Sequence, residues 1–243
     1  MKPVKARVDQ LLVDRGLAES REKAQALILA GEVMVNGQKA DKPGRTVAAD
    51  SRLEVTGRLP YVSRGGVKLA GALDAFAVDP KGMVAIDVGT STGGFTDCLL
   101  QRGAVRVHAV DTGAGQIDWK LRTDSRVVLH ENVNARYLMP EAIGEPVDLI
   151  VCDVSFISVT LLLPRFPALL KPEGQFIVLI KPQFEVGREN VGKGGIVRDA
   201  ALHEACCAKV REAAESLGFG TRIVPSPILG TEGNQEFLLH ACH

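Results

Sequence analysis

Apolar residues in the first part of the chain repeat with two different periods. Over residues 8–29 they recur three or four positions apart, which predicts two short helices, and Ser20 can cap the second. The segment VMVNGQKA, residues 33–40, alternates apolar and polar positions around an Asn-Gly pair, the strongest short signal for a β-hairpin. Residues 51–55 supply a further short strand. The pattern predicts a small α+β unit over residues 1–58.

Beyond residue 84 the chain shows short apolar runs of strand length, separated by stretches long enough for helices. This alternation is typical of a mostly parallel sheet that helices cover on both faces. Two late runs joined by a short loop predict a pair of antiparallel strands. The seven predicted strands span residues 84–89, 105–111, 126–132, 147–154, 174–180, 221–227 and 236–242. We therefore predict an α/β, Rossmann-like seven-stranded sheet in a domain of residues 65–243, with a linker at 59–64.

Composition narrows the class of protein. With 243 residues, 46% of them hydrophobic and 24% charged, the chain suits a folded protein with one large core. No run of about 18 apolar residues occurs, and the N-terminus lacks the apolar core of a secretory signal, so we expect a cytoplasmic protein without a membrane partner. Five cysteines include no CxxC pair, which favours reduced thiols and no metal site.

Charge is divided unevenly, although the net charge is zero. Residues 1–68 carry 13 Lys or Arg against 8 Asp or Glu, whereas the remainder carries 16 against 21. A basic front module favours a polyanion-binding arm, and the alternative is a solvated lysine-rich face.

The segment RVDQLLVDRGLAESREKAQALILAGEVMVNGQKADKPG, residues 7–44, resembles the alpha-L type of RNA-binding domain first seen in a small-subunit ribosomal protein. The matching features are Arg-x-Asp, Ser-Arg at the second helix, Gly-x-Val and Val-Asn-Gly. The resemblance implies that the second helix and the hairpin face structured RNA. The candidate RNA contacts, each with a solvated surface charge as the alternative, are Arg7, Arg21, Lys23, Lys39 and Lys42.

Further candidate RNA contacts lie outside this segment, namely Arg64, Arg188, Lys193 and Arg198. Three of them belong to a glycine-rich loop, and its part GRENVGKG, residues 187–194, has the G-x4-G-K spacing of a phosphate-binding P-loop. A glycine replaces the Ser or Thr that would hold magnesium, and Gly-Gly follows instead of a helix. We therefore interpret the segment as a basic loop near the substrate.

A glycine-rich turn in AIDVGTSTGGFTDCLLQRG, residues 85–103, joins a predicted strand to a predicted helix, where backbone amides can approach a ligand. A dinucleotide fingerprint would place Gly89, Ser91 and Gly94 at its glycine positions, and the serine weakens that alternative. The pattern Asp-x-Gly-x-Ser-x-Gly, residues 87–93, resembles the first motif of S-adenosylmethionine-dependent methyltransferases. The resemblance implies S-adenosyl-L-methionine as cofactor; a glycine-rich helix entry without a ligand is the remaining alternative.

The ends of the neighbouring strands add further candidates. Asp111 ends the second strand and is suited to accept hydrogen bonds from ribose hydroxyls, and the third strand ends where such methyltransferases commonly contact the adenine. The cofactor-binding residues implied by the resemblance are Asp87, Gly89, Ser91, Gly93, Gly94, Phe95, Asp111, Asn132, Val133 and Asp153.

Ligands of an open parallel sheet collect at the carboxyl ends of its strands. Asp153 and Lys181 end two predicted strands, and Glu236 opens an antiparallel strand, so all three lie at this edge; Lys68, on the helix before the first strand, can lie beside them. The order K-D-K-E resembles the tetrad of FtsJ-type ribose 2'-O-methyltransferases. Together with SRGGVKL, CDVSFIS and LIKPQFE, it makes the chain similar to the TlyA family, cytidine 2'-O-methyltransferases of ribosomal RNA that were historically labelled hemolysins.

The resemblance implies methyl transfer to a cytidine ribose 2'-hydroxyl of ribosomal RNA, with Lys68, Asp153, Lys181 and Glu236 as catalytic residues. We expect Lys181 to act as general base, which a lysine can do only when its pKa falls from about 10.4 toward about 7–8. Lys68 would orient the ribose, and the two carboxylates would hold the lysines. Alternatively, Lys181 stays charged and stabilises the developing oxyanion, or it is a snorkelling strand-end lysine.

Other functions are less consistent with the residues. DVSF, residues 153–156, lacks the Pro-Pro-aromatic pattern of methyltransferases that act on exocyclic amines, and Cys152 within a strand suits a core thiol better than a nucleophile for carbon-5 methylation. A noncatalytic RNA-binding or ribosome assembly factor and a membrane-lysing hemolysin stay as alternatives, although no long basic amphipathic helix is evident. Nothing in the residues decides which subunit RNA is modified.

Overall fold

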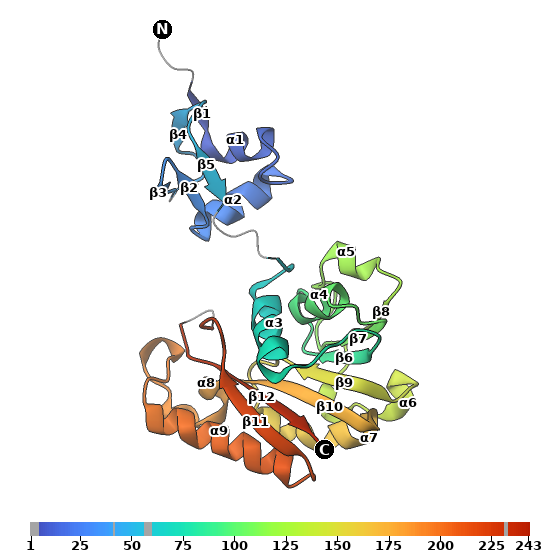
Figure 1. Ribbon diagram of the computed structural model, residues 1–243. Coiled ribbons are helices and arrows are strands. Elements are labelled where there is room, and N and C mark those ends of the chain that lie inside the picture. Colours follow the sequence, from blue (N-terminus) through green and yellow to red (C-terminus); the bar gives the residue numbers. More distant parts are fainter. Residues whose placement is uncertain (1–4, 41, 56–59, 231–232) are drawn as a thin grey trace. The chain divides into compact units, whose positions relative to one another are not determined.

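The computed structural model describes residues 5–40, 42–55, 60–230 and 233–243 (Figure 1). The chain divides into two compact units, residues 1–59 and 60–243. The predicted domain boundary at residue 58 and the first residue of the predicted linker, Leu59, lie outside the described residues.

The first unit contains the predicted helices and hairpin. Its elements are β1 (Lys5–Arg7), α1 (Val8–Asp14), α2 (Arg21–Leu29), β2 (Val33–Val35), β3 (Gln38–Lys39), β4 (Thr46–Ala48) and β5 (Leu53–Val55). The Ser20 hydroxyl accepts a hydrogen bond from the Lys23 N–H and so caps α2. Asn36 and Gly37 both have positive φ, which is the turn that an Asn-Gly hairpin requires.

The core of the first unit is formed by the apolar face of the two helices and by the short strands. Val8, Leu12, Ala24, Ile28 and Val33 are almost fully buried there. Strand β2 pairs with β3 on one side and with β5 on the other, which gives a three-stranded antiparallel sheet. Strands β1 and β4 form a separate antiparallel pair that the sequence did not predict, because three residues are too few for a visible alternation.

The second unit is built on one sheet of seven strands in the order β11-β12-β10-β9-β6-β7-β8. The strands are β6 (Val84–Val88), β7 (Arg106–Val110), β8 (Val127–His130), β9 (Val147–Cys152), β10 (Leu170–Ile180), β11 (Gly220–Pro225) and β12 (Phe237–Cys242). Strands β8, β7, β6, β9 and β10 are parallel, whereas β12 is antiparallel to both of its neighbours. The predicted seven-stranded α/β sheet is confirmed, and β12 is its one reversed strand.

Helices pack on both faces of this sheet, as Figure 1 shows. On one face, α3 (Arg64–Phe76) and α4 (Gly94–Gln101) bury Leu69, Leu73 and Leu99. On the other face, α7 (Phe166–Leu169) and α9 (Ala200–Glu215) bury Phe166 and Val210. The remaining helical segments are α5 (Trp119–Arg122), α6 (Pro140–Ile143), α8 (Pro182–Glu185) and the 3-10 turns η1 (Ala135–Tyr137), η2 (Val159–Leu161), η3 (Leu163–Arg165), η4 (Arg188–Asn190) and η5 (Lys193–Gly195). Because both faces are covered, the central strands are continuous apolar runs.

Candidate active site

Four charged residues lie where the topology brings strand ends together. Asp153 follows β9 directly, and Lys181 follows β10 and begins the turn into α8. Glu236 immediately precedes β12, and because this strand is antiparallel to β10, its start lies at the carboxyl edge of the parallel strands. Lys68 lies in the second turn of α3.

These residues form two ion pairs. The Lys181 ammonium lies 2.5 Å from Asp153 Oδ1 and donates a hydrogen bond to Ser155 Oγ at 2.9 Å. The Lys68 ammonium lies 2.5 Å from Glu236 Oε2, and both of these side chains are at least 90% buried. A buried lysine is costly unless a carboxylate pairs with it, and each of these two lysines has such a partner.

The turn after β6 comes close to the segment that follows β9. Gly89 has φ of 84°, and a Cβ atom at this position would lie 2.4 Å from the carbonyl oxygen of Asp153. The Gly89 N–H also donates to the Val110 carbonyl at 2.9 Å, which ties the turn to the end of β7. Only glycine fits the backbone angle and the close approach together.

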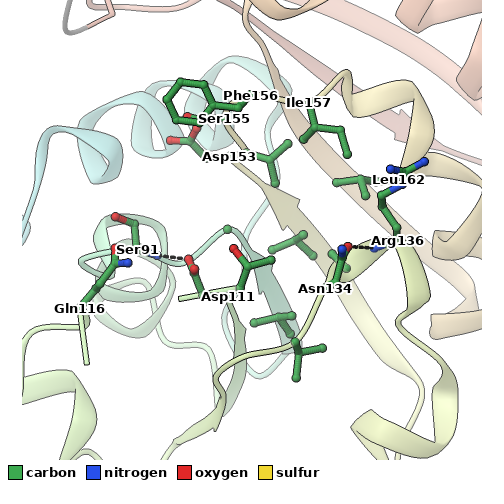
Figure 2. A pocket seen from close by; sticks show the side chains of 17 residues that line it. Ser91, Asp111, Gln116, Asn134, Arg136, Asp153, Ser155, Phe156, Ile157 and Leu162 are labelled. Atoms are coloured by element: carbon green, nitrogen blue, oxygen red, sulfur yellow. Dashed lines mark hydrogen bonds between the residues drawn. The ribbon is translucent and has the colours of Figure 1, made fainter. Parts of the chain in front are cut away.

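A cavity of about 510 Å³ opens at the carboxyl ends of β6, β7 and β9. Figure 2 shows Ser91, Asp111 and Gln116 on one side of it, and Asn134, Arg136 and Leu162 on the other. Asp153, Ser155 and Phe156 line it as well. Asp153 therefore belongs both to the cavity wall and to the ion pair with Lys181, which places the cavity next to a charged lysine.

Comparison with known proteins agrees with this arrangement. The FtsJ-like methyltransferase family matches residues 61–242, and the S4 domain matches residues 6–53. The chain belongs to the FtsJ-like methyltransferase family. The family predicted from the sequence is thereby confirmed, and the methyltransferase unit is the one that carries the cavity.

Relatives extend the match to both units. A putative rRNA methyltransferase, YqxC of Bacillus subtilis, is 50% identical over 240 residues, covering 97% of this chain and 85% of the relative. The 16S/23S rRNA (cytidine-2'-O)-methyltransferase TlyA of Mycobacterium tuberculosis is 47% identical over 97% of this chain and 89% of its own length. A solved putative hemolysin from Streptococcus thermophilus has 45% identity and a TM-score of 0.77, covering 100% of this chain and 89% of that one.

Half of the predicted cofactor-binding residues line the cavity of the methyltransferase unit, namely Gly89, Ser91, Asp111, Val133 and Asp153. The Asp111 carboxylate accepts hydrogen bonds from the Ser91 N–H and from the Gly113 N–H, each at 2.7 Å. It therefore fixes the glycine-rich turn as well as facing the cavity.

The other predicted cofactor-binding residues do not line the cavity. Gly93 and Gly94 serve packing, since a Cβ atom would lie 2.3 Å from Leu121 at the first and 2.2 Å from the Ser63 hydroxyl at the second. Phe95 is buried in the core beside α3, and Asn132 takes a turn conformation with φ of 60°. The motif predicts residues near the turn, but it does not distinguish those that line the cavity from those that pack behind it.

Asp87, the fifth of these, is fully buried in β6. Its Oδ2 accepts hydrogen bonds from the Thr96 N–H at 2.9 Å and from the Thr96 hydroxyl at 2.7 Å, so it ties β6 to the start of α4. Burial raises the pKa of this carboxyl to about 7, with nearby Asp153 and Asp111 adding to the increase.

We expect Asp87→Asn to flatten the pH dependence of stability. Between about pH 4 and pH 7 folded Asp87 keeps a proton that the unfolded chain has released, so its contribution to stability is present at low pH and is lost as the pH rises through this window. The free energy of unfolding of the variant relative to wild type should rise by about 2–4 kcal/mol from pH 4 to pH 8. Urea denaturation across this range measures it, and parallel pH profiles of the two proteins would contradict it.

Several cavity residues were missed by sequence reasoning. Gln116 comes from a loop, and Asn134 and Arg136 come from the start of the 3-10 turn η1; none belongs to a recognisable motif. Phe156, which was noted only as part of DVSF, has φ of 65° and is 92% exposed at the cavity. A bulky non-glycine residue in that conformation is uncommon, and no sequence pattern reveals it.

Two alternatives from the sequence are decided by position. Cys152 is the last residue of β9 and is fully buried, and burial raises the pKa of its thiol, so it is a core thiol as predicted. The segment 187–194 contains η4 and the start of η5, and α9 begins only at Ala200, so it lacks the helix that a P-loop requires.

The predicted RNA contacts differ in how they are held. In the first unit, the guanidinium groups of Arg7 and Arg21 both donate to the fully buried carboxylate of Asp9, yet each arginine remains about half exposed. Arg7 holds the pKa of Asp9 well below its usual range. The two guanidinium groups are therefore oriented before any ligand arrives.

The remaining candidates are exposed. Lys23 pairs with Glu19 at 2.5 Å, Lys39 belongs to β3, and Lys42 lies in the loop before β4. In the second unit, Arg64 donates to the Leu229 carbonyl at 2.7 Å. Arg188, Lys193 and Arg198 are exposed on the segment between α8 and α9.

Proposed function

We propose that this protein transfers a methyl group from S-adenosyl-L-methionine to the ribose 2'-hydroxyl of a cytidine in ribosomal RNA. The observation that carries the proposal is Lys181, whose ammonium is held between Asp153 and Ser155, both of which line the cavity. The relative from Mycobacterium tuberculosis that is 47% identical carries the name of this reaction.

The residues around the cavity fit S-adenosyl-L-methionine. Gly89 lets its turn approach the Asp153 backbone, and both line the cavity. Asp111 offers carboxylate oxygens for ribose hydroxyls, and Val133 offers an apolar wall. When bound, this cofactor supplies an activated methyl group on a sulfonium. Asp153 would add a carboxylate close to that positive charge, which favours binding of the cation.

The lysines act on the other reactant. Lys181 would meet the 2'-hydroxyl and either accept its proton or stabilise the charge that develops on its oxygen. Because the Lys181 ammonium contacts Asp153 in the free protein, it must leave this ion pair to reach a ribose hydroxyl. Lys68, fixed by Glu236, would orient the ribose.

The test is transfer of labelled methyl from S-adenosyl-L-methionine to ribosomal subunits and to free rRNA from cells that lack this gene. Digestion of the product to nucleosides identifies the modified atom, and we expect 2'-O-methylcytidine. Cofactor binding without transfer to either subunit or to free RNA would favour the noncatalytic assembly factor.

A membrane-lysing role is tested separately. No helix in the described ranges is long and apolar enough to cross a bilayer. Leakage of lipid vesicles caused by the purified, cofactor-free protein would revive this alternative, and intact vesicles at concentrations that support methyl transfer would not.

The N-terminal unit should supply affinity for RNA. We expect Arg21→Gln to weaken rRNA binding about 3- to 30-fold and to reduce the slope of log affinity against log salt by about one, because one oriented guanidinium is lost. Arg52→Gln is the matched control, since Arg52 pairs with Glu54 on the surface of the same unit. Equal losses in both variants would contradict a specific role for Arg21.

A further inference from the structure

The carboxylate of Glu185 is buried outside the cavity, at the end of α8. Its side chain is 2% exposed, yet both oxygens are occupied. Oε2 accepts a hydrogen bond from the Ser158 hydroxyl at 2.6 Å and lies 3.0 Å from the Lys209 ammonium, and Oε1 accepts from the Val159 N–H at 2.8 Å. All these donors come from the protein itself, so the Glu185 carboxylate links the end of α8 to residues 158–159 and to α9.

The segment that Glu185 holds is the one that meets Lys181. Residues 153–158 join β9 to η2 and include Asp153 and Ser155, which both contact the Lys181 ammonium. The segment is fixed at its start by the Asp153 N–H, which donates to the Val88 carbonyl at 2.9 Å. Glu185 fixes its end at Ser158 and the following amide.

Glu185 also lies on the same short stretch of chain as Lys181. Lys181 directly precedes α8, which begins at Pro182, and Glu185 is the last residue of this helix. The Glu185 carboxylate therefore connects the segment after β9 to α8, which follows β10. The Lys209 ammonium, on α9, contacts both the carboxylate and the backbone carbonyl of Glu185, so α9 is joined to the same connection. Charge-assisted hydrogen bonds in a buried place hold such a connection rigidly.

We propose that Glu185 is a positioning residue of the methyltransferase site: it fixes the segment 153–158 so that Asp153 and Ser155 meet the Lys181 ammonium. The inference rests on the proposed function, and it needs no contact between Glu185 and either reactant. A displacement of about 1 Å in a catalytic group can cost about 100-fold in rate, so the connection acts through geometry.

The variant to test is Glu185→Gln, which keeps the size and an acceptor oxygen but removes the charge. Asp148→Asn is the matched control. Asp148 accepts from the Val84 N–H at 2.9 Å and pairs with the Lys171 ammonium at 2.7 Å, so it shares with Glu185 one amide donor and one lysine partner. It lies near the starts of β6 and β9, at the opposite edge of the sheet.

For Glu185→Gln we expect kcat, expressed per cofactor-binding site, to fall about 10- to 100-fold. KM for RNA should change by less than about threefold. The rate is measured at saturating S-adenosyl-L-methionine, because residues 153–157 also line the cavity. Asp148→Asn should lower the melting temperature without this loss in kcat. A wild-type kcat in Glu185→Gln, or an equal loss in Asp148→Asn, would overturn the proposal.

A spectroscopic readout separates this inference from the proposed function. In protein labelled with carbon-13 at lysine, the Lys181 ε-carbon signal, assigned by its loss in Lys181→Arg, should move in Glu185→Gln while the Lys171 signal stays. In Asp148→Asn the pattern should reverse. An unmoved Lys181 signal overturns the positioning role, whereas a wild-type protein that methylates no ribose overturns only the proposed reaction.

Discussion

Lys181→Ala should reduce methyl transfer to rRNA by about 1000-fold, since acid–base or electrostatic groups of this kind contribute about 10²–10⁴. Affinity for S-adenosyl-L-methionine should stay within about threefold, because Lys181 does not line the cavity. Single-turnover methyl transfer and calorimetric cofactor binding measure the two effects. Asp153 is left without its ammonium, but its side chain is 21% exposed and water can solvate it.

Lys171→Ala is the control for this variant. Lys171 is the second residue of β10, whereas Lys181 directly follows the last, and each lysine pairs with an aspartate. The control should transfer methyl at the wild-type rate. If the Lys181→Ala protein retains more than about a tenth of the wild-type rate, Lys181 has no direct role in methyl transfer.

Lys181→Arg distinguishes the two roles of this lysine. Arginine keeps the positive charge but does not release its proton in proteins. If the lysine stabilises the oxyanion, the arginine variant keeps part of the activity, and if it is the base, this variant is as slow as Lys181→Ala.

Gly89→Ala should lower affinity for S-adenosyl-L-methionine by more than about tenfold. A positive φ costs alanine about 1–2 kcal/mol, and the added Cβ would lie 2.4 Å from the Asp153 carbonyl oxygen, so the turn and the segment after β9 must move apart. Both segments line the cavity. Calorimetric titration with the cofactor measures the loss.

Gly82→Ala controls for the backbone effect alone. Gly82 has φ of 78°, close to that of Gly89, but a Cβ atom there has nothing within 4 Å. The free energy of unfolding of this variant should fall by about the 1–2 kcal/mol that a positive φ costs alanine. Its affinity for the cofactor should equal that of the wild type. Equal cofactor affinity in the two variants would show that the close approach at Gly89 is unimportant for binding.

The sheet was predictable because its residues obey simple periodicities. Runs such as VDLIVC are apolar throughout since both faces of a parallel strand are buried, and glycine-rich turns mark where they end. The predicted strand begins at residue 174, four residues after the start of β10. Residues 171–174, Lys-Pro-Glu-Gly, interrupt the apolar run, and the pairing with β9 shifts register between Leu170 and Gln175. Hydrophobic patterns do not detect such a stretch.

The charged residues of the site were predictable by topology, but their pairing was not. Strand direction placed Lys181 and Glu236 at one edge, and the resemblance supplied Lys68. Which carboxylate meets which lysine depends on side-chain rotamers and on loops such as residues 153–158. Phe156, with its positive φ, belongs to this loop, and the buried acceptor Glu185 ends the short helix α8; no periodicity describes either residue.

The order of the strands has a consequence for the protein while the ribosome is still making it. Glu236, the counter-ion of Lys68, immediately precedes β12, the last strand to be synthesised, and β12 lies between β10 and β11. A nascent chain without this strand leaves the Lys68 ammonium unpaired and gives β11 no neighbour, and contacts this distant along the chain form late. The complete set of four charges is therefore assembled only once β12 has joined the sheet.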